Sequence, residues 1–107
     1  MNIRIAKKKI RFRLDMAEAK QLLERDALQR LTEILKLPGG QEFKYGVHLF
    51  SDLDEMKLDV RDGTWVLNVP FPVFKDLVLS SPSKEGIEAQ VGELRVSLEI
   101  DISKKPQ

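Results

Sequence analysis

The sequence predicts an α+β domain in which a β-β-α-β-β unit occurs twice, giving about eight mainly antiparallel strands and two short helices. Residues 2–14 alternate apolar and charged side chains on either side of a two-residue turn, and residues 57–69 repeat this pattern. A short helical pattern follows each of these two hairpins. We therefore expect one domain over residues 1–107, built as a sandwich or a partly closed barrel. Its units would span about 1–51 and 56–102, with a frayed tail at 103–107.

The first hairpin has one apolar face and one cationic face. A turn at Lys7-Lys8 sets Arg4 opposite Arg11 and places the alternating apolar residues together on the other face. These apolar residues are Ile3, Ile5, Ile10, Phe12 and Leu14. The agreement between turn and alternation supports this register.

The second hairpin repeats the first at matching positions. Its turn is Asp62-Gly63, one of the strongest short hairpin signals, because type I′ turns need positive φ at both central residues. The apolar residues at corresponding positions are Leu58, Val60, Trp65, Leu67 and Val69. We expect Trp65 to pair with Val60 on the core face.

A capped helix follows the first hairpin. Asp15 is a good N-cap, and Glu18 three residues later completes a capping box, so the sequence predicts a helix from Met16 to about Arg25. Helix propensity alone would let this helix continue to Lys36.

A strand is the competing interpretation for the residues beyond that helix, and we favour it. Leu28–Leu35 would turn at Pro38-Gly39-Gly40 and pair with Glu42–Phe50, where apolar residues alternate. The second unit supports this choice because it also ends in a hairpin, with Gly86–Val91 and Leu94–Ile102 on either side of Gly92-Glu93.

The helix of the second unit is predicted from its prolines and its apolar spacing. Pro70 and Pro72 stand where the start of a helix tolerates proline, and Phe74 and Leu77 begin an apolar face. The segment Ser80–Lys84 is rich in serine and contains a proline, so it should separate this helix from the last hairpin.

Composition restricts the classes of function. The 107 residues carry a formal net charge of +1, which provides no overall field to attract nucleic acid or an anionic membrane. The chain has no cysteine, which excludes disulfides, thiolate nucleophiles and cysteine-based metal sites. No apolar run is long enough for a membrane span, and none near the start resembles a signal peptide. We therefore expect a cytoplasmic protein.

The sequence resembles a family of short bacterial proteins whose function is unassigned. The resemblance covers nearly the whole chain and is most specific in IRIAKKKIRFRL at the start and EGIEAQVGELRVSLEIDI at the end, with GGQEFKYGVHL between them. It implies a strand, not a long helix, at Leu28–Leu35. It implies no catalytic residue.

The cationic face of the first hairpin is the candidate site. Arg4 and Arg11 face each other, and like charges directly opposite on a sheet are destabilising. The interpretation we favour is an ion-pair network with Glu99 or Asp101 of the last strand. The functional alternative is an anion site in which guanidinium groups grip phosphate or carboxylate. Its candidate residues are Arg4, Lys7, Lys9, Arg11 and Arg13.

Other candidate sites are weaker. His48 is the sole histidine and should point outward without a partner, as incidental histidines do. The acidic segment 51–55 lacks the graded spacing and glycine of an EF-hand, so we expect no metal site. Nucleic-acid binding is disfavoured because no exposed aromatic residues accompany the basic ones. No motif for a cofactor or a catalytic residue is present.

The sequence favours a small non-catalytic module for binding or assembly, with an unidentified protein partner or self-association and no membrane. A sheet edge could recruit the partner, as could an exposed apolar patch at Val73, Phe74, Val78 and Leu79. The alternative is a small enzyme that acts on a phosphorylated small molecule. That enzyme would need an acidic or histidine side chain beside the same arginines.

Overall fold

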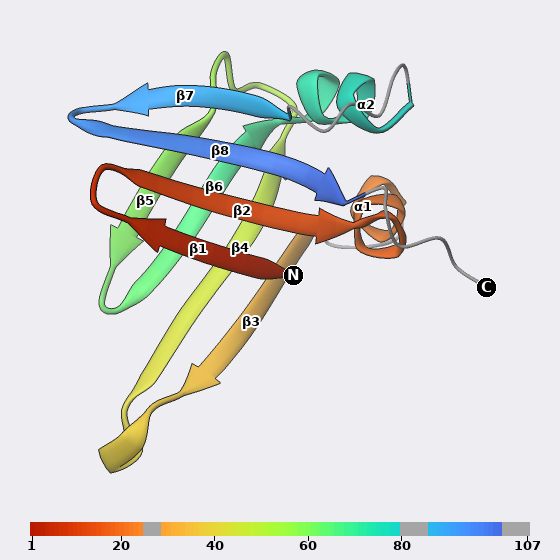
Figure 1. Cartoon of the computed structure of the whole chain (residues 1–107). Helices are drawn as coiled ribbons and strands as arrows, with labels where there is room; N and C mark the ends of the chain where they lie inside the picture. Colours follow the sequence, from red (N-terminus) through yellow and green to blue (C-terminus); the bar gives the residue numbers. More distant parts are fainter. Residues whose placement is uncertain (25–28, 80–85, 102–107) are drawn as a thin grey trace.

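Two four-stranded sheets cross face to face, and both helices lie at one end of the crossing (Figure 1). This computed structural model describes residues 1–24, 29–79 and 86–101. Within the part of the chain it describes, no helix is long and apolar enough to cross a membrane. The predicted tail at 103–107 and the break at Ser80–Lys84 lie outside the described residues.

The elements follow the predicted β-β-α-β-β order in each half. In chain order they are β1 Asn2–Ala6, β2 Lys9–Asp15, α1 Met16–Leu23, β3 Arg30–Lys36, the 3₁₀ turn η1 Pro38–Gly40, β4 Glu42–Phe50, β5 Lys57–Arg61, β6 Thr64–Pro70, α2 Phe71–Leu79, β7 Ile87–Val91 and β8 Leu94–Asp101. The predicted α+β class is confirmed, and the arrangement fits a duplicated unit.

Each sheet takes one hairpin from each half of the chain. Sheet A has the strand order β1-β2-β8-β7, and sheet B has the order β3-β4-β6-β5. All four hairpins are antiparallel, whereas the central pairs β2–β8 and β4–β6 are parallel. Of the two predicted architectures, the structure has the sandwich-like one. The described strands form two separate sheets and no closed barrel.

The predicted hairpin registers are confirmed. In the first hairpin Arg4 lies opposite Arg11. In the second, Val60 lies opposite Trp65 at the matching place. Asp62, in the turn, has a φ of 48° and Gly63 a φ of 75°, as a type I′ turn requires.

Helix α1 begins with the predicted capping box. The Glu18 backbone N–H donates to Asp15 Oδ1 over 2.8 Å, and the Asp15 N–H donates to Glu18 Oε1 over 3.0 Å. These two bonds satisfy donors that a helix start leaves free. The helix ends at Leu23, shorter than predicted, because Glu24 already has an extended backbone with φ −70° and ψ 131°. Arg25 lies outside the described residues.

The predicted strand after α1 is confirmed, and the long-helix alternative is wrong. Strand β3 pairs with β4 over its full length, from Arg30 opposite His48 to Lys36 opposite Glu42. The hairpin then turns through η1, where Gly39 has a φ of 83°. Its far end extends beyond sheet A as an arm (Figure 1). The exposed side chains of Ile34, Leu35 and Leu37 lie on this arm.

The core lies between the sheets and beneath the helices. Its central strands contribute residues buried on the inner faces: Phe12, Leu14, Val47, Leu49, Leu67, Val69, Val96, Leu98 and Ile100. The helices add Ala19, Leu22, Phe74, Leu77 and Val78. Each inward strand residue removes apolar area from water, which is the main stabilising term of such a fold.

Two expectations about the core are wrong at the hairpin ends. Val60 is 53% exposed and Ile5 is 57% exposed, although their cross-strand partners Trp65 and Ile10 are half-buried and buried. Both residues lie on edge strands near a turn, where little of the opposite sheet covers them. Trp65 packs edge-on against Phe43, with ring centroids 5.4 Å apart.

Candidate functional site

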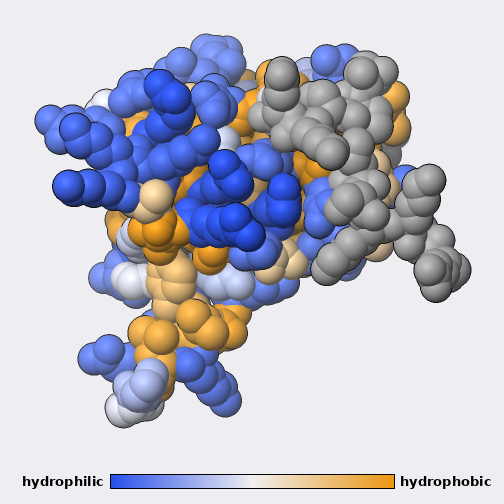
Figure 2. Space-filling model, in the orientation of Figure 1, coloured by the Kyte–Doolittle hydropathy of each residue, from blue (hydrophilic) through white to orange (hydrophobic). Residues whose placement is uncertain are grey.

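The arginine cluster, Arg4, Arg11 and Arg13, lies on the outer face of sheet A. Arg4 projects from edge strand β1, and the other two project from β2 beside β8. Figure 2 shows hydrophilic side chains gathered over this face. The sequence therefore predicted correctly that these residues come together.

Glu99 of β8 partly neutralises this cluster. Its carboxylate oxygens lie 2.8 Å from Arg11 Nε and 3.6 Å from Arg13 Nη2. Glu99 is only 8% exposed, so these ion pairs are better shielded from water than ordinary surface pairs. The favoured interpretation, an ion-pair network with the last strand, therefore describes Arg11 and Arg13. Arg4 is exposed and has no ion pair with a described residue within 4.0 Å.

Several polar atoms in this region lack hydrogen-bond partners among the described residues. Ser97, opposite Arg11 in the register, is 1% exposed, and its Oγ is buried without a partner. Arg11 Nε is close to Glu99, but its N–H is not aligned with the carboxylate, so the contact is an ion pair and not a hydrogen bond. Arg13 Nε is also buried and unpartnered.

The lysines at the first turn are not drawn into the cluster. Lys7 is exposed, and Lys9 Nζ lies 3.7 Å from Glu88 of β7. A cavity of about 380 Å³ lies beside Arg13, but Asp15 and Glu18 also line it. These carboxylates disfavour an anion in that cavity.

His48 and the acidic segment lie away from the arginines. His48 is on β4 of sheet B, and it does not line the cavity beside Arg13. It is half-buried, and not freely exposed as expected; burial and the nearby Arg30 lower its pKa from 6.5. Within the described residues, no group of three or more acidic or histidine side chains is placed to bind a metal.

A larger cavity, the β5–β7 cleft, opens between the edge strands of the two sheets. Its volume is about 750 Å³, within the range of small-molecule sites. Its apolar lining comes from four elements: Leu58 of β5 with the preceding Met56, Pro70 at the end of β6, Val73 of α2, and Ile87, Ala89 and Val91 of β7. Glu55, Lys57, Glu88 and Gln90 complete the lining.

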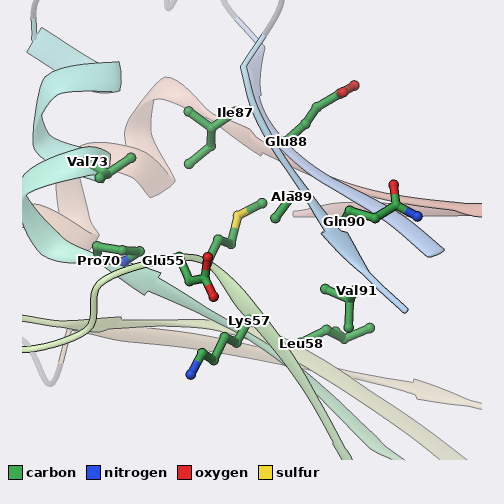
Figure 3. A pocket seen from close by; sticks show the side chains of 11 residues that line it. Glu55, Lys57, Leu58, Pro70, Val73, Ile87, Glu88, Ala89, Gln90 and Val91 are labelled. Atoms are coloured by element: carbon green, nitrogen blue, oxygen red, sulfur yellow. The ribbon is translucent and has the colours of Figure 1, made fainter. Parts of the chain in front are cut away.

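Figure 3 shows how these side chains are arranged. Ile87, Ala89 and Val91 point from β7 into the cleft, while Glu88 and Gln90 point away from its centre. Val73 approaches from α2 on one side, and Leu58 lies near Val91 at the other end. The cleft therefore has an apolar interior with charged groups at its margin.

Residues 1–104 match the sequence model of a family of unknown function (DUF7009). The chain belongs to this family. The predicted relationship to a family of unassigned function is thereby confirmed. Comparison of this DUF7009 chain with curated proteins and with solved structures gives no match.

Sequence reasoning missed the β5–β7 cleft. The expected apolar patch on the second helix was only partly correct, because Phe74 and Val78 are buried, whereas Val73 is 41% and Leu79 62% exposed. Only Val73 of these four lines the cleft. One available signal was strand β7 itself, IEAQV, which among the edge strands that the structure describes is the only one with neither lysine nor arginine.

Proposed function

We propose that this domain is a non-catalytic binding module that holds an apolar ligand in the β5–β7 cleft. The observation that carries the proposal is the cleft itself, about 750 Å³ with apolar side chains from β5, β7 and α2 converging in it. Concave, largely apolar sites are the usual places for ligand binding.

A matched pair of variants on α2 tests the proposal. Val73→Glu places a carboxylate in the cleft, whereas Leu79→Glu makes the same change on the same helix at a residue that does not line the cleft. Both positions are exposed, so both variants should fold. The probe is Nile red, an uncharged apolar dye whose fluorescence rises in apolar surroundings.

We expect the wild-type protein and Leu79→Glu to bind Nile red alike and Val73→Glu to bind it about tenfold more weakly, since a charge in an apolar site is poorly solvated. Circular dichroism should show the same fold for all three proteins. Equal binding by all three, or no binding by the wild type, would contradict the proposal.

An anion site at the basic hairpin is a second candidate function. It is supported by the arginine cluster, in which Arg4 lies opposite Arg11 and, among the described residues, Glu99 is the one carboxylate within 4.0 Å of Arg11 and Arg13. The unpartnered Ser97 Oγ and the two arginine Nε groups add hydrogen-bonding capacity. Lys7 and Lys9 would add positive charge at the turn. The engagement of Arg11 and Arg13 with Glu99 argues against it, which is why it comes second.

Thermal unfolding with phosphate, sulfate, polyphosphate and nucleotides tests this second candidate. A ligand that binds only the folded protein stabilises it, by about 2.7 kcal/mol when its concentration is ~100 times its dissociation constant. The melting temperature rises as a result. A site requires a selective rise that disappears in Arg11→Ala. If no ligand changes the melting temperature and Arg11→Ala is less stable than the wild type, the arginines have a structural role and do not form an anion site.

A further inference from the structure

We propose that the occupant of the β5–β7 cleft is an extended peptide segment with alternating apolar side chains, which adds as a strand to the free edge of β7. This proposal rests on the proposed function and names the class of its ligand. Strand addition gives affinity through backbone hydrogen bonds and selectivity through pockets for alternate side chains. Strand β7 has both features, because it lies at the edge of sheet A and its inner face lines the apolar cleft.

The edge of β7 is the least protected of the four sheet edges. Natural sheets blunt exposed edges with lysine and other charges, proline or bulges. Strands β1, β3 and β5 all carry such charges, namely Arg4, Arg30, Lys36, Lys57 and Arg61.

Strand β7 has no lysine, arginine, proline or bulge, and only one charged residue. Its sequence IEAQV contains no proline, and it pairs with β8 without a break, from Ile87 opposite Leu98 to Val91 opposite Leu94. Its one charge, Glu88, lies 3.7 Å from Lys9 Nζ and 4.0 Å from Arg95 Nε of its own sheet. Among the described residues, the opposite edge of β7 therefore offers its backbone N–H and C=O groups with little to repel an added strand.

The inner face of β7 supplies the pockets for alternate side chains. Ile87, Ala89 and Val91 point into the cleft, and Ala89 is the smallest of the three (Figure 3). A strand alongside β7 would also direct every second side chain inward, because successive side chains alternate between faces. Those side chains would enter the space bounded by Met56, Leu58 and Val73.

The corresponding place in the first half of the chain is bridged by ion pairs. The Met1 ammonium lies 2.5 Å from Glu18 Oε2 of α1 and 3.1 Å from Glu33 Oε1 of β3. The Tyr45 hydroxyl donates to Glu33 Oε2 over 3.0 Å. Burial lowers the pKa of the Met1 ammonium, but hydrogen bonds with Glu18 and Glu33 outweigh burial and raise it above 8.0.

Matching the registers of the two halves relates these groups to the cleft. The shift that takes the pair Ile5–Ile10 to Val60–Trp65 takes Met1 to Met56 and Glu18 to Val73. The same shift takes Lys9 to Thr64, so their parallel partners Arg95 and Lys44 occupy corresponding positions, and β8 corresponds to β4. The strands paired with these two, β3 and β7, then correspond as well, with Glu33 at the position of Ala89.

All three counterparts, Met56, Val73 and Ala89, line the cleft. The two carboxylates that pair with the Met1 ammonium, Glu18 and Glu33, are thus replaced by small apolar side chains in the second half. The ion pairs that hold the edge strand β3 to α1 in the first half therefore have no equivalent at β7. What remains is an apolar opening beside an unprotected edge, which suits an apolar strand supplied by another chain.

The test begins with a phage-displayed random peptide library selected against the full chain. We expect enriched sequences with apolar residues at alternate positions. A synthetic peptide of the enriched sequence should bind the wild type and Leu79→Glu within about twofold of each other, and Val73→Glu about tenfold more weakly, because only Val73 is in the cleft.

Backbone methylation of that peptide distinguishes strand addition from simple apolar capture. Only alternate N–H groups of an edge-paired strand face its partner. Methylating one alternate set should abolish binding, whereas methylating the other set should leave it within a few-fold of the parent. Amide hydrogen exchange at 87–91 should slow when the unmodified peptide binds.

The outcomes separate the two proposals. Nile red binding that depends on Val73, with no peptide enriched or with equal tolerance of both methylated sets, overturns strand addition and leaves the apolar site standing. If the wild-type protein binds neither Nile red nor any peptide, both proposals are overturned. A complex that contains two copies of this chain and no peptide would assign the edge to self-association and would also overturn the peptide proposal.

Discussion

Glu99 forms ion pairs with two arginines of sheet A, Arg11 and Arg13. It is 8% exposed and lies between two guanidinium groups, each on the neighbouring strand β2. A shielded charge pair of this kind contributes little beyond a well-packed apolar alternative, but removing one partner leaves the other charge poorly solvated. Substitution of Glu99 should therefore lower stability by more than the net contribution of its ion pairs.

We predict that Glu99→Gln lowers the free energy of unfolding by about 1–3 kcal/mol, less than a fully buried pair because both arginines are partly exposed. Urea denaturation measures this change. The matched control is Glu88→Gln, whose ion pairs with Lys9 and Arg95 are exposed at the surface. Its effect should stay within about 0.5 kcal/mol.

If both glutamine variants were equally stable, Glu99 would not anchor the arginine cluster in solution. The anion-site candidate would then gain, because Arg11 and Arg13 would be available to a ligand.

At the scale of single elements, local pattern was a good guide. The hairpin registers and the capping box follow from alternation, turn residues and the spacing of Asp15 and Glu18, all of which act over a few residues. The β3 strand needed more than propensity, since its residues also suit a helix. Its full-length pairing with β4 outweighs that propensity, as tertiary context often does.

Gly46 marks a close approach between β3 and β4 that no local pattern revealed. A Cβ at this position would lie 2.5 Å from the Leu31 carbonyl oxygen and 3.2 Å from Thr32 Cα, both backbone atoms. Backbone atoms move only by shifting the strand, so a side chain here must distort the hairpin.

Gly46→Ala should therefore lower the free energy of unfolding by about 2 kcal/mol or more. Gly63→Ala is the control, since its Cβ would meet no atom within 4 Å and its cost, about 1 kcal/mol, comes only from a φ of 75°. Urea denaturation of both variants measures the difference. A Gly46→Ala protein as stable as the control would mean that β3 and β4 lie farther apart than in this structure.

At the scale of the whole molecule, the sequence predicted the content of the fold but not its connectivity. The parallel pairs β2–β8 and β4–β6 join strands from different halves of the chain. Such strands are not connected by a hairpin turn, so no turn motif in the sequence indicates that they pair. Ile10 and Val96, for example, are cross-strand neighbours with almost the entire chain between them. Alternation shows which face of each strand is apolar, but it does not show which strand lies beside it.

The candidate sites show the same division. The arginine cluster was predictable because Arg4 and Arg11 belong to one hairpin. The β5–β7 cleft was not, because it exists only where edges of two different sheets meet α2. The replacement of Glu18 by Val73 at matching positions was visible in the sequence, yet its meaning depends on a surface that only the assembled fold creates.

The sharing of hairpins between the sheets also sets an order for assembly during synthesis. All four strands of sheet B lie within residues 30–70, so that sheet can form once this stretch has left the ribosome. Sheet A must wait for β7 and β8, and until then β2 has a free edge where β8 will pair. Pairings between distant residues also form slowly. The newly made chain therefore passes through a stage with one sheet complete and an unpaired strand exposed, the stage at which a molecular chaperone would be most useful.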